Sequence, residues 1–171
     1  NIGIRSEYFM YSIRYVDISD AEILGNIHSK SWQIAYKGII ADEILENFTP
    51  EKRSEYFKRV ISEKREEYAL VFEDDKSVGL VCFGKCRDQD LDCTYGEISG
   101  IYLLPDYWNK GSGSYLIKWT FNELLSRNYN SVAVWVLEKN LSARKFYESV
   151  GFEIDGTVKE NKIGNILKEY R

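Results

Sequence analysis

The chain has few prolines, few cysteines and no long apolar run, and each shortage excludes a class of protein. Its 171 residues include two prolines and three cysteines. No linker, repeat or low-complexity tract interrupts the sequence. No apolar run approaches the ~20 residues that a membrane-spanning helix needs. We therefore expect one domain with a full hydrophobic core and no membrane partner.

The three cysteines, Cys82, Cys86 and Cys93, are an odd number and contain no CxxC pair. Zinc sites usually show closely paired ligands. We expect reduced thiols in a cytoplasmic protein and no metal site, with metal binding as the alternative. The single histidine, His28, falls within a predicted helix, and no serine or cysteine can be tied to it, which argues against a Ser-His-Asp triad.

The chain also has no excess of positive charge, since its net charge at pH 7 is −4. Phosphate binding draws on Lys and Arg, so this balance argues against a nucleic-acid partner. It is compatible with a cationic substrate. The first nine residues do not resemble a signal peptide. We expect the domain to span 10–171, with Met10 as the initiator and residues 1–9 as an extension or an expression remnant.

Residue periodicity predicts an α/β protein with a mixed sheet and helices on both of its faces. Ser19-Asp20-Ala21-Glu22 has the pattern of a capping box for a helix that ends near Tyr36, and Thr49-Pro50 should begin a second helix. Further helices are expected over 111–127 and 140–150. Strands are expected over 11–16, 68–73, 78–85, 95–104 and 132–137, with a final pair within 152–170.

A glycine turn joins the strand over 95–104 to the helix over 111–127. Gly111 and Gly113 let the main chain curl closely around an anion. The free amides of a helix start, with the helix dipole, favour negative charge there. A pyrophosphate meets these requirements, and an ordinary tight turn is the alternative. A P-loop pattern is absent, and Leu116 stands where a dinucleotide fold needs a third glycine.

The segment Asn140 to Phe152, NLSARKFYESVGF, follows the apolar strand 132–137 and lies downstream of the glycine turn. Together with that turn it resembles the GNAT superfamily of acyl-CoA N-acyltransferases. The resemblance covers roughly Tyr11 to the C-terminus and is densest from Glu97 to Phe152. It implies the GNAT fold, a central mixed and mostly antiparallel sheet of about seven strands flanked by helices, and acetyl-CoA as cofactor.

The resemblance also implies a set of cofactor-binding positions. The family pattern at the turn is Gln/Arg-x-x-Gly-x-Gly/Ala, and Trp108 departs from its first position, which leaves Lys110 as the nearest cation. Gly100 should mark a strand bulge where the pantetheine arm binds backbone. The implied cofactor-binding residues are Ile101, Tyr102, Leu103, Trp108, Asn109, Lys110, Gly111, Ser112, Gly113, Ser114, Asn140 and Tyr147.

Two residues are candidates for proton transfer. Tyr147 occupies the family's tyrosine position, where the phenol points at the CoA sulphur, and it is our candidate acid; packing in an apolar helix stripe is the alternative. Glu97 begins the bulged strand, where many relatives place a carboxylate that works through water. It is our candidate base, and surface solvation is the alternative. Asn140 could serve only as a helix cap.

The segment Ser31 to Ile40, SWQIAYKGII, resembles a subset of bacterial GNAT proteins that includes a polyamine acetyltransferase. Trp32 and Tyr36 lie four residues apart and share a helix face. The resemblance implies that they border the acceptor pocket, where they could hold a cation by π contact. Core packing is the alternative for at least one of them.

Three functions are consistent with these patterns. The first is a small-molecule N-acetyltransferase that transfers acetyl from acetyl-CoA to a primary amine, such as a polyamine, in a ternary complex. The second is a peptide or protein N-terminal acetyltransferase. The third is a non-catalytic acyl-CoA sensor, which could act as a homodimer.

Overall fold

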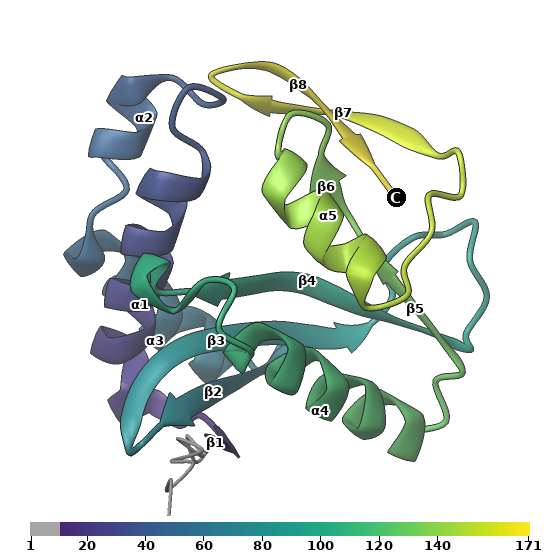
Figure 1. Cartoon of the computed structure of the whole chain (residues 1–171), viewed down its shortest axis with the longest axis horizontal. Helices are drawn as coiled ribbons and strands as arrows, with labels where there is room; N and C mark the ends of the chain where they lie inside the picture. Colours follow the sequence, from purple (N-terminus) through teal and green to yellow (C-terminus); the bar gives the residue numbers. More distant parts are fainter. Residues whose placement is uncertain (1–10) are drawn as a thin grey trace, which may run out of the picture.

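A computed structural model describes residues 11–171 of the chain. It contains a five-stranded sheet of order β1-β2-β3-β4-β5 and a three-stranded sheet of order β6-β8-β7 (Figure 1). The strands are β1 (Tyr11–Tyr15), β2 (Glu67–Glu73), β3 (Lys76–Lys85), β4 (Tyr95–Leu103), β5 (Ser131–Val134), β6 (Val136–Leu137), β7 (Val158–Ile163) and β8 (Asn165–Tyr170). The extension predicted over residues 1–9 and the proposed initiator Met10 lie outside the described residues.

Five α-helices and two short 3-10 helices connect these strands in the described part of the chain. They are η1 (Ile18–Asp20), α1 (Ala21–Ala35), α2 (Asp42–Glu46), α3 (Pro50–Glu63), η2 (Pro105–Tyr107), α4 (Ser112–Ser126) and α5 (Leu141–Ser149). Within residues 11–171, no helix is long and apolar enough to cross a bilayer. The mixed sheet with flanking helices confirms the predicted fold class.

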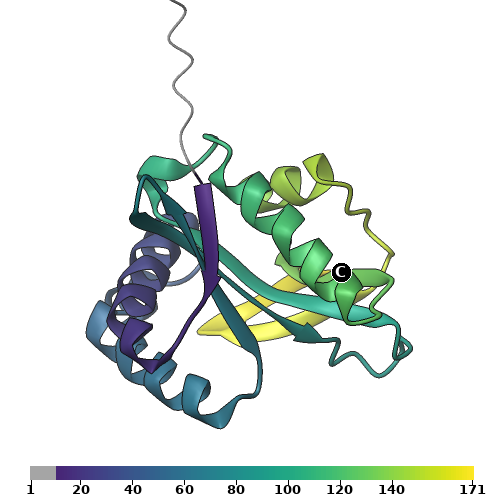
Figure 2. The same ribbon diagram turned by 90° about the horizontal axis from the view of Figure 1, so that it is seen from below.

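The two faces of the five-stranded sheet are covered by different helices (Figure 2). On β2, Ala69 and Val71 belong to the core under α4 and α5, whereas Tyr68 and Leu70 pack against α1 and α3. This alternation follows from the two-residue period of a strand. Because both faces are buried, the strand reads as a continuous apolar run.

The first helix starts differently from our prediction. The capping box forms two residues earlier, where Asp17 accepts from the Ser19 amide and Asp20 accepts from the Asp17 amide. It caps the 3-10 turn η1, and α1 follows with no side-chain cap of its own. Aspartate caps as well as serine does, and Asp20 is also fixed by an ion pair with Arg14 at 2.8 Å.

The connection between α1 and α3 contains the short helix α2, which the sequence analysis missed. A helix of five residues has too few turns to show a clear helical periodicity of apolar residues. α3 begins as predicted, with the Thr49 hydroxyl accepting from the Lys52 amide at 3.4 Å and Pro50 in the first turn. On α4, Leu116, Ile117 and Leu124 are buried, whereas Leu125 is 61% exposed.

The strands β4 and β5 pair in parallel and then separate. Their pairing runs from Tyr95 opposite Ser131 to Ile98 opposite Val134. Beyond that point Trp135 interrupts the strand that we predicted to be continuous over 132–137, and β6 pairs with β8 instead. The separated strands leave one edge of β4 unpaired after Ile98 within the described residues.

The predicted bulge in β4 is confirmed. Cys82 of β3 pairs with Gly100 and the next residue, Phe83, pairs with Ile98, so Ser99 has no partner in the register. Gly100 is required here because an added Cβ would lie 2.5 Å from the Tyr102 ring. The bulge therefore falls at the level where β4 and β5 part.

Candidate active site

The turn before α4 is built from residues that adopt left-handed backbone angles. Gly111 has φ +104° and Asn109 has φ +59°, a region that glycine and asparagine tolerate best. The Tyr11 hydroxyl, on the neighbouring strand β1, donates to the Lys110 carbonyl oxygen at 2.8 Å. The loop conformation is therefore fixed both by its sequence and by a brace from β1.

The amino end of α4 is open for an anion. The first amides of a helix have no partner inside the helix, and no side chain of residues 11–171 caps this end. Gly113 lets the helix approach its neighbours, because an added Cβ would lie 2.9 Å from Leu103 and 3.4 Å from Phe146. These features, together with the unpaired edge of β4, fit a ligand with a diphosphate and an extended amide arm.

Trp108 does not stand free at the position where the family pattern has Gln or Arg. Its indole Nε1–H donates to the Leu103 carbonyl oxygen at 2.9 Å, which ties the loop back to β4. Positive charge comes from two lysines instead. Lys110 and Lys76 place their ammonium groups 5.8 and 5.3 Å from the centre of the Tyr107 ring. Lys76 comes from the β2–β3 turn, and the sequence offered no signal that it would reach this loop.

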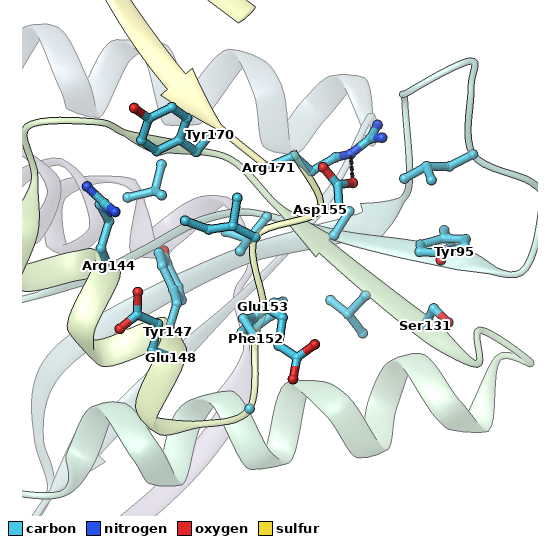
Figure 3. A pocket seen from close by; sticks show the side chains of 17 residues that line it. Tyr95, Ser131, Arg144, Tyr147, Glu148, Phe152, Glu153, Asp155, Tyr170 and Arg171 are labelled. Carbon is cyan, nitrogen blue, oxygen red and sulfur yellow. Dashed lines mark hydrogen bonds and ion pairs between the residues drawn. The ribbon is translucent and has the colours of Figure 1, made fainter. Parts of the chain in front are cut away.

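Tyr147 is buried on the inner side of α5, with 8% of its surface exposed. It lines a cavity of about 450 Å³ together with Val134 and Val136, and Figure 3 shows its ring in this cavity between Arg144 and Phe152. Burial raises the pKa of the phenol well above its usual value of 10, and the nearby Tyr36 contributes further. The phenol therefore stays protonated at neutral pH.

Glu97 is also buried, at 5% exposure, rather than solvated. Arg87 binds its carboxylate through Nε at 2.9 Å and Nη2 at 2.7 Å, and the Arg87 backbone amide adds a bond of 3.1 Å. These bonds raise the pKa of Arg87. The sequence analysis missed Arg87, because a residue in an irregular loop carries no periodic signal of its contacts.

The two predicted acceptor residues pack together at the end of α1. The rings of Trp32 and Tyr36 lie 4.7 Å apart, and Trp32 stacks on Phe48 at 4.0 Å. The pKa of Tyr36 is raised to about 12, mainly by burial and also by the charge of Glu169, while a hydrogen bond with Asn140 opposes the shift. Tyr36 therefore lies near Asn140 and Tyr147, which connects the predicted acceptor residues with the predicted acid.

Asn140 and Tyr102 have defined structural roles at this site. The Asn140 side chain caps α5 by accepting from the Ala143 amide at 3.2 Å. Tyr102 is partly buried, with its ring centre 4.3 Å from that of His28. Ile101 and Leu103 lie on β4 beyond its last pair with β5. Their backbone therefore borders the gap between the two separated strands.

His28 packs inside an aromatic cluster and is not linked to a nucleophile. Its Nδ1 accepts from Arg53 Nε at 3.3 Å, and among the described residues its Nε2 has no hydrogen-bond partner. Burial lowers the pKa of His28 to about 3, and the charge of Arg53 adds to the shift. The neutral imidazole is therefore part of the core, which agrees with the absence of a Ser-His-Asp triad expected from the sequence.

Comparisons with known proteins agree with this geometry. The profile of the Acetyltransferase (GNAT) family matches residues 29–152. The chain is 27% identical over 135 residues to the uncharacterised N-acetyltransferase YuaI of Bacillus subtilis, covering 78% of this chain and 75% of that protein. It is 24% identical over 152 residues to a spermidine N(1)-acetyltransferase of Thermoplasma acidophilum, covering 85% and 89%.

The fold is likewise that of solved acetyltransferases. The crystal structure of the PaiA N-acetyltransferase from Thermoplasma acidophilum, in complex with coenzyme A, superposes with a TM-score of 0.72 at 21% identity and covers 95% of this chain and 98% of that chain. The family profile, which spans most of the chain, and the separated strands beside an open helix start lead to one conclusion. The chain belongs to the GNAT family of N-acetyltransferases, for which acetyl-CoA is the usual acyl donor.

Proposed function

We propose that this acetyltransferase transfers acetyl from acetyl-CoA to a primary amine of a small molecule, by direct attack of the amine in a ternary complex. The observation that carries the proposal is the proximity of Tyr147 to Tyr36, which contributes to the raised pKa of Tyr147, because it links the predicted acid with the aromatic acceptor residues. Direct attack is favoured over an acyl-enzyme, because the buried Cys82 has a raised pKa and would be a poor nucleophile.

The cofactor would be held by the loop and strand described above. The amides of Ser112, Gly113 and Ser114 at the start of α4 would bind the diphosphate, with Lys110 and Lys76 as the nearby cations. The free edge of β4 at Ile101 and Leu103 would bind the amide arm through backbone groups. When bound, the cofactor supplies an activated acetyl thioester.

Proton transfer is assigned to two side chains. Tyr147 would protonate the departing thiolate; a thiol has a pKa of ~8.5, so this assistance is modest, about 2 kcal/mol. A primary amine has a pKa of ~10.4, and freeing it at pH 7 costs ~4–5 kcal/mol. Glu97, the third residue of β4, would accept that proton through water. Its ion pair with Arg87, at 2.7 Å, fixes the position of the carboxylate.

The acceptor would bind beside Trp32 and Tyr36. Their rings offer π faces to an ammonium group, and a small amine suits the tightly packed cluster that they form with Phe48. The similarity to the Thermoplasma spermidine N(1)-acetyltransferase supports a small amine over a peptide. A peptide or protein acceptor remains the alternative, and an amine panel separates the two.

The test combines binding with turnover. Calorimetric titration with acetyl-CoA should give a micromolar Kd, and thiol release should depend on an added primary amine. A panel of diamines, monoamines and N-terminal peptides identifies the acceptor class. Turnover of peptides alone would contradict the small-molecule assignment. Tight cofactor binding with turnover of no amine or peptide would identify a non-catalytic acyl-CoA sensor instead.

A further inference from the structure

The ammonium group of Lys159 on β7 is held by a ring and a carboxylate. Its Nζ lies 3.9 Å from the centre of the Trp135 ring and 3.5 Å from a carboxylate oxygen of Glu169. A π face with an adjacent carboxylate is a favourable environment for an alkylammonium ion. The protein therefore contains a site for a primary ammonium group, which we call the Trp135–Glu169 site.

This site lies where β4 and β5 separate. Trp135 directly follows the last β4–β5 pair, at Val134. Val134 and Val136 line the cavity that contains Tyr147, and Trp135 does not. Because successive side chains of an extended chain point to opposite faces, Trp135 faces away from α5, across the sheet from that cavity.

The register of β8 places Glu169 on the same side as the predicted acceptor residues. Glu169 lies directly opposite Leu137 on β6 and opposite Lys159 on β7. Leu137 and Leu167, the latter two residues before Glu169, pack in one cluster with Trp32 and Tyr36. A molecule bound at the Trp32 and Tyr36 rings would therefore have the Glu169 carboxylate within its neighbourhood.

Lys159 and Glu169 differ in how firmly they are held. The Glu169 side chain is 13% exposed and also accepts from Asn161 Nδ2 at 3.4 Å, whereas the Lys159 side chain is 45% exposed. Trp135 itself is anchored, because its Nε1–H donates to Asp88 at 2.9 Å. The ring and the carboxylate are thus fixed, and the half-exposed lysine can leave.

We propose that Trp135 and Glu169 bind the second, non-reacting ammonium group of a diamine acceptor, and that Lys159 occupies this site when no acceptor is bound. The proposal rests on the proposed function and narrows its substrate class to amines with two positive charges. Glu169 acts as a specificity-determining residue, and Lys159 acts as an internal competitor of the acceptor.

The test compares 1,4-diaminobutane with 1-aminobutane, which lacks the second charge. Glu169→Gln should raise the KM for the diamine about tenfold, a loss of about 1.4 kcal/mol. It should leave the KM for the monoamine and for acetyl-CoA unchanged. Lys159→Met should lower the KM for the diamine. Lys168→Met removes an exposed charge from β8 and serves as the control, with no expected effect.

Opposite effects of the Glu169 and Lys159 variants would not arise from lost stability, since both substitutions remove the same ion pair. Equal effects of Glu169→Gln on both amines, or a higher diamine KM in Lys159→Met, would overturn the proposal. A direct calorimetric titration of 1,4-diaminobutane into the CoA-loaded protein separates it from the proposed function. If the wild-type protein binds 1,4-diaminobutane but does not acetylate it, and Glu169→Gln abolishes this binding, the site is retained and the enzymatic assignment is rejected. If the wild-type protein does not bind the diamine, the site is rejected.

Discussion

Arg87 binds both carboxylate oxygens of the buried Glu97, through Nη2 at 2.7 Å and Nε at 2.9 Å. The pair is asymmetric, because the Arg87 side chain is 65% exposed and the Glu97 side chain only 6%. Removing the arginine would leave a carboxylate inside the fold without its principal partner. Arg87 therefore fixes the glutamate near the start of β4, next to the point where β4 and β5 separate.

Arg87→Met should lower the free energy of unfolding by about 1–3 kcal/mol. This is less than for a fully buried pair, because water already screens the guanidinium. Urea denaturation at pH 7 measures the change. Arg59→Met, which removes an arginine with no ion pair among the described residues, is the control and should cost much less. Equal losses in both variants would mean that the Glu97 pair contributes no special stability.

Glu97→Gln should lower kcat at least tenfold while the KM for acetyl-CoA stays unchanged, because the amide cannot accept the amine proton. The dependence of kcat/KM on pH adds a readout that a structural role would not change. Without the base, only the amine that is already deprotonated can react, so kcat/KM should rise more steeply as the pH approaches the pKa of the free amine. A variant with lower stability and unaltered kcat would exclude Glu97 as the base.

Tyr147→Phe should reduce kcat about 10- to 100-fold, the range of a modest general acid. Affinity for CoA should stay within about twofold by calorimetry, because phenylalanine keeps the ring that packs between Phe146 and Phe152. Tyr170→Phe, on the opposite wall of the same cavity in Figure 3, is the matched control and should retain turnover. Full activity of Tyr147→Phe would remove the phenol from the mechanism.

Gly111→Ala should weaken CoA binding about tenfold, because φ +104° is strained for any side chain by roughly 1–3 kcal/mol. Gly156→Ala is a close control. Gly156 has φ +89° and open space around its Cβ position, but it lies in the loop before β7. The melting temperature should fall by a similar amount in both variants, and only Gly111→Ala should lose cofactor affinity. Equal affinities would place the diphosphate elsewhere.

His28 should make the protein sensitive to acid. Its pKa is about 3 in the folded state against 6.5 for a free imidazole, so the unfolded chain binds the extra proton first. The stability from this residue is complete above pH 6.5 and is lost as the pH falls from there toward 3. The loss amounts to roughly 2 kcal/mol between pH 6.5 and 5.

His28→Gln should lower the stability at pH 7 and flatten its decline between pH 6.5 and 5. Urea denaturation at several pH values measures both effects. Carboxylates such as Asp20, whose pKa is lowered by Arg14, lose their stabilising contribution only at lower pH. That loss should be the same in the variant. An unchanged slope in His28→Gln would show that the imidazole is not neutral in the fold.

The sequence determined those features that depend on neighbouring residues. The glycines and Asn109 of the anion loop, the Thr49–Pro50 helix start and the bulge at Gly100 are set by local backbone sterics and hydrogen bonds. The order of strands and helices followed from periodicity, as did the inward position of Tyr147. The break at Trp135 and the exposure of Leu125 were not predictable, because both depend on which neighbour covers each face.

Only the tertiary structure decided which distant residues meet. It brought Arg87 onto Glu97, Lys76 to the anion loop, and Lys159 to both Trp135 and Glu169. None of these pairs leaves a local signal, since a charged side chain in a loop or edge strand has the same pattern whether or not it has a partner. Ion pairs across elements are selected by sheet register and strand separation, which form only when the whole chain packs.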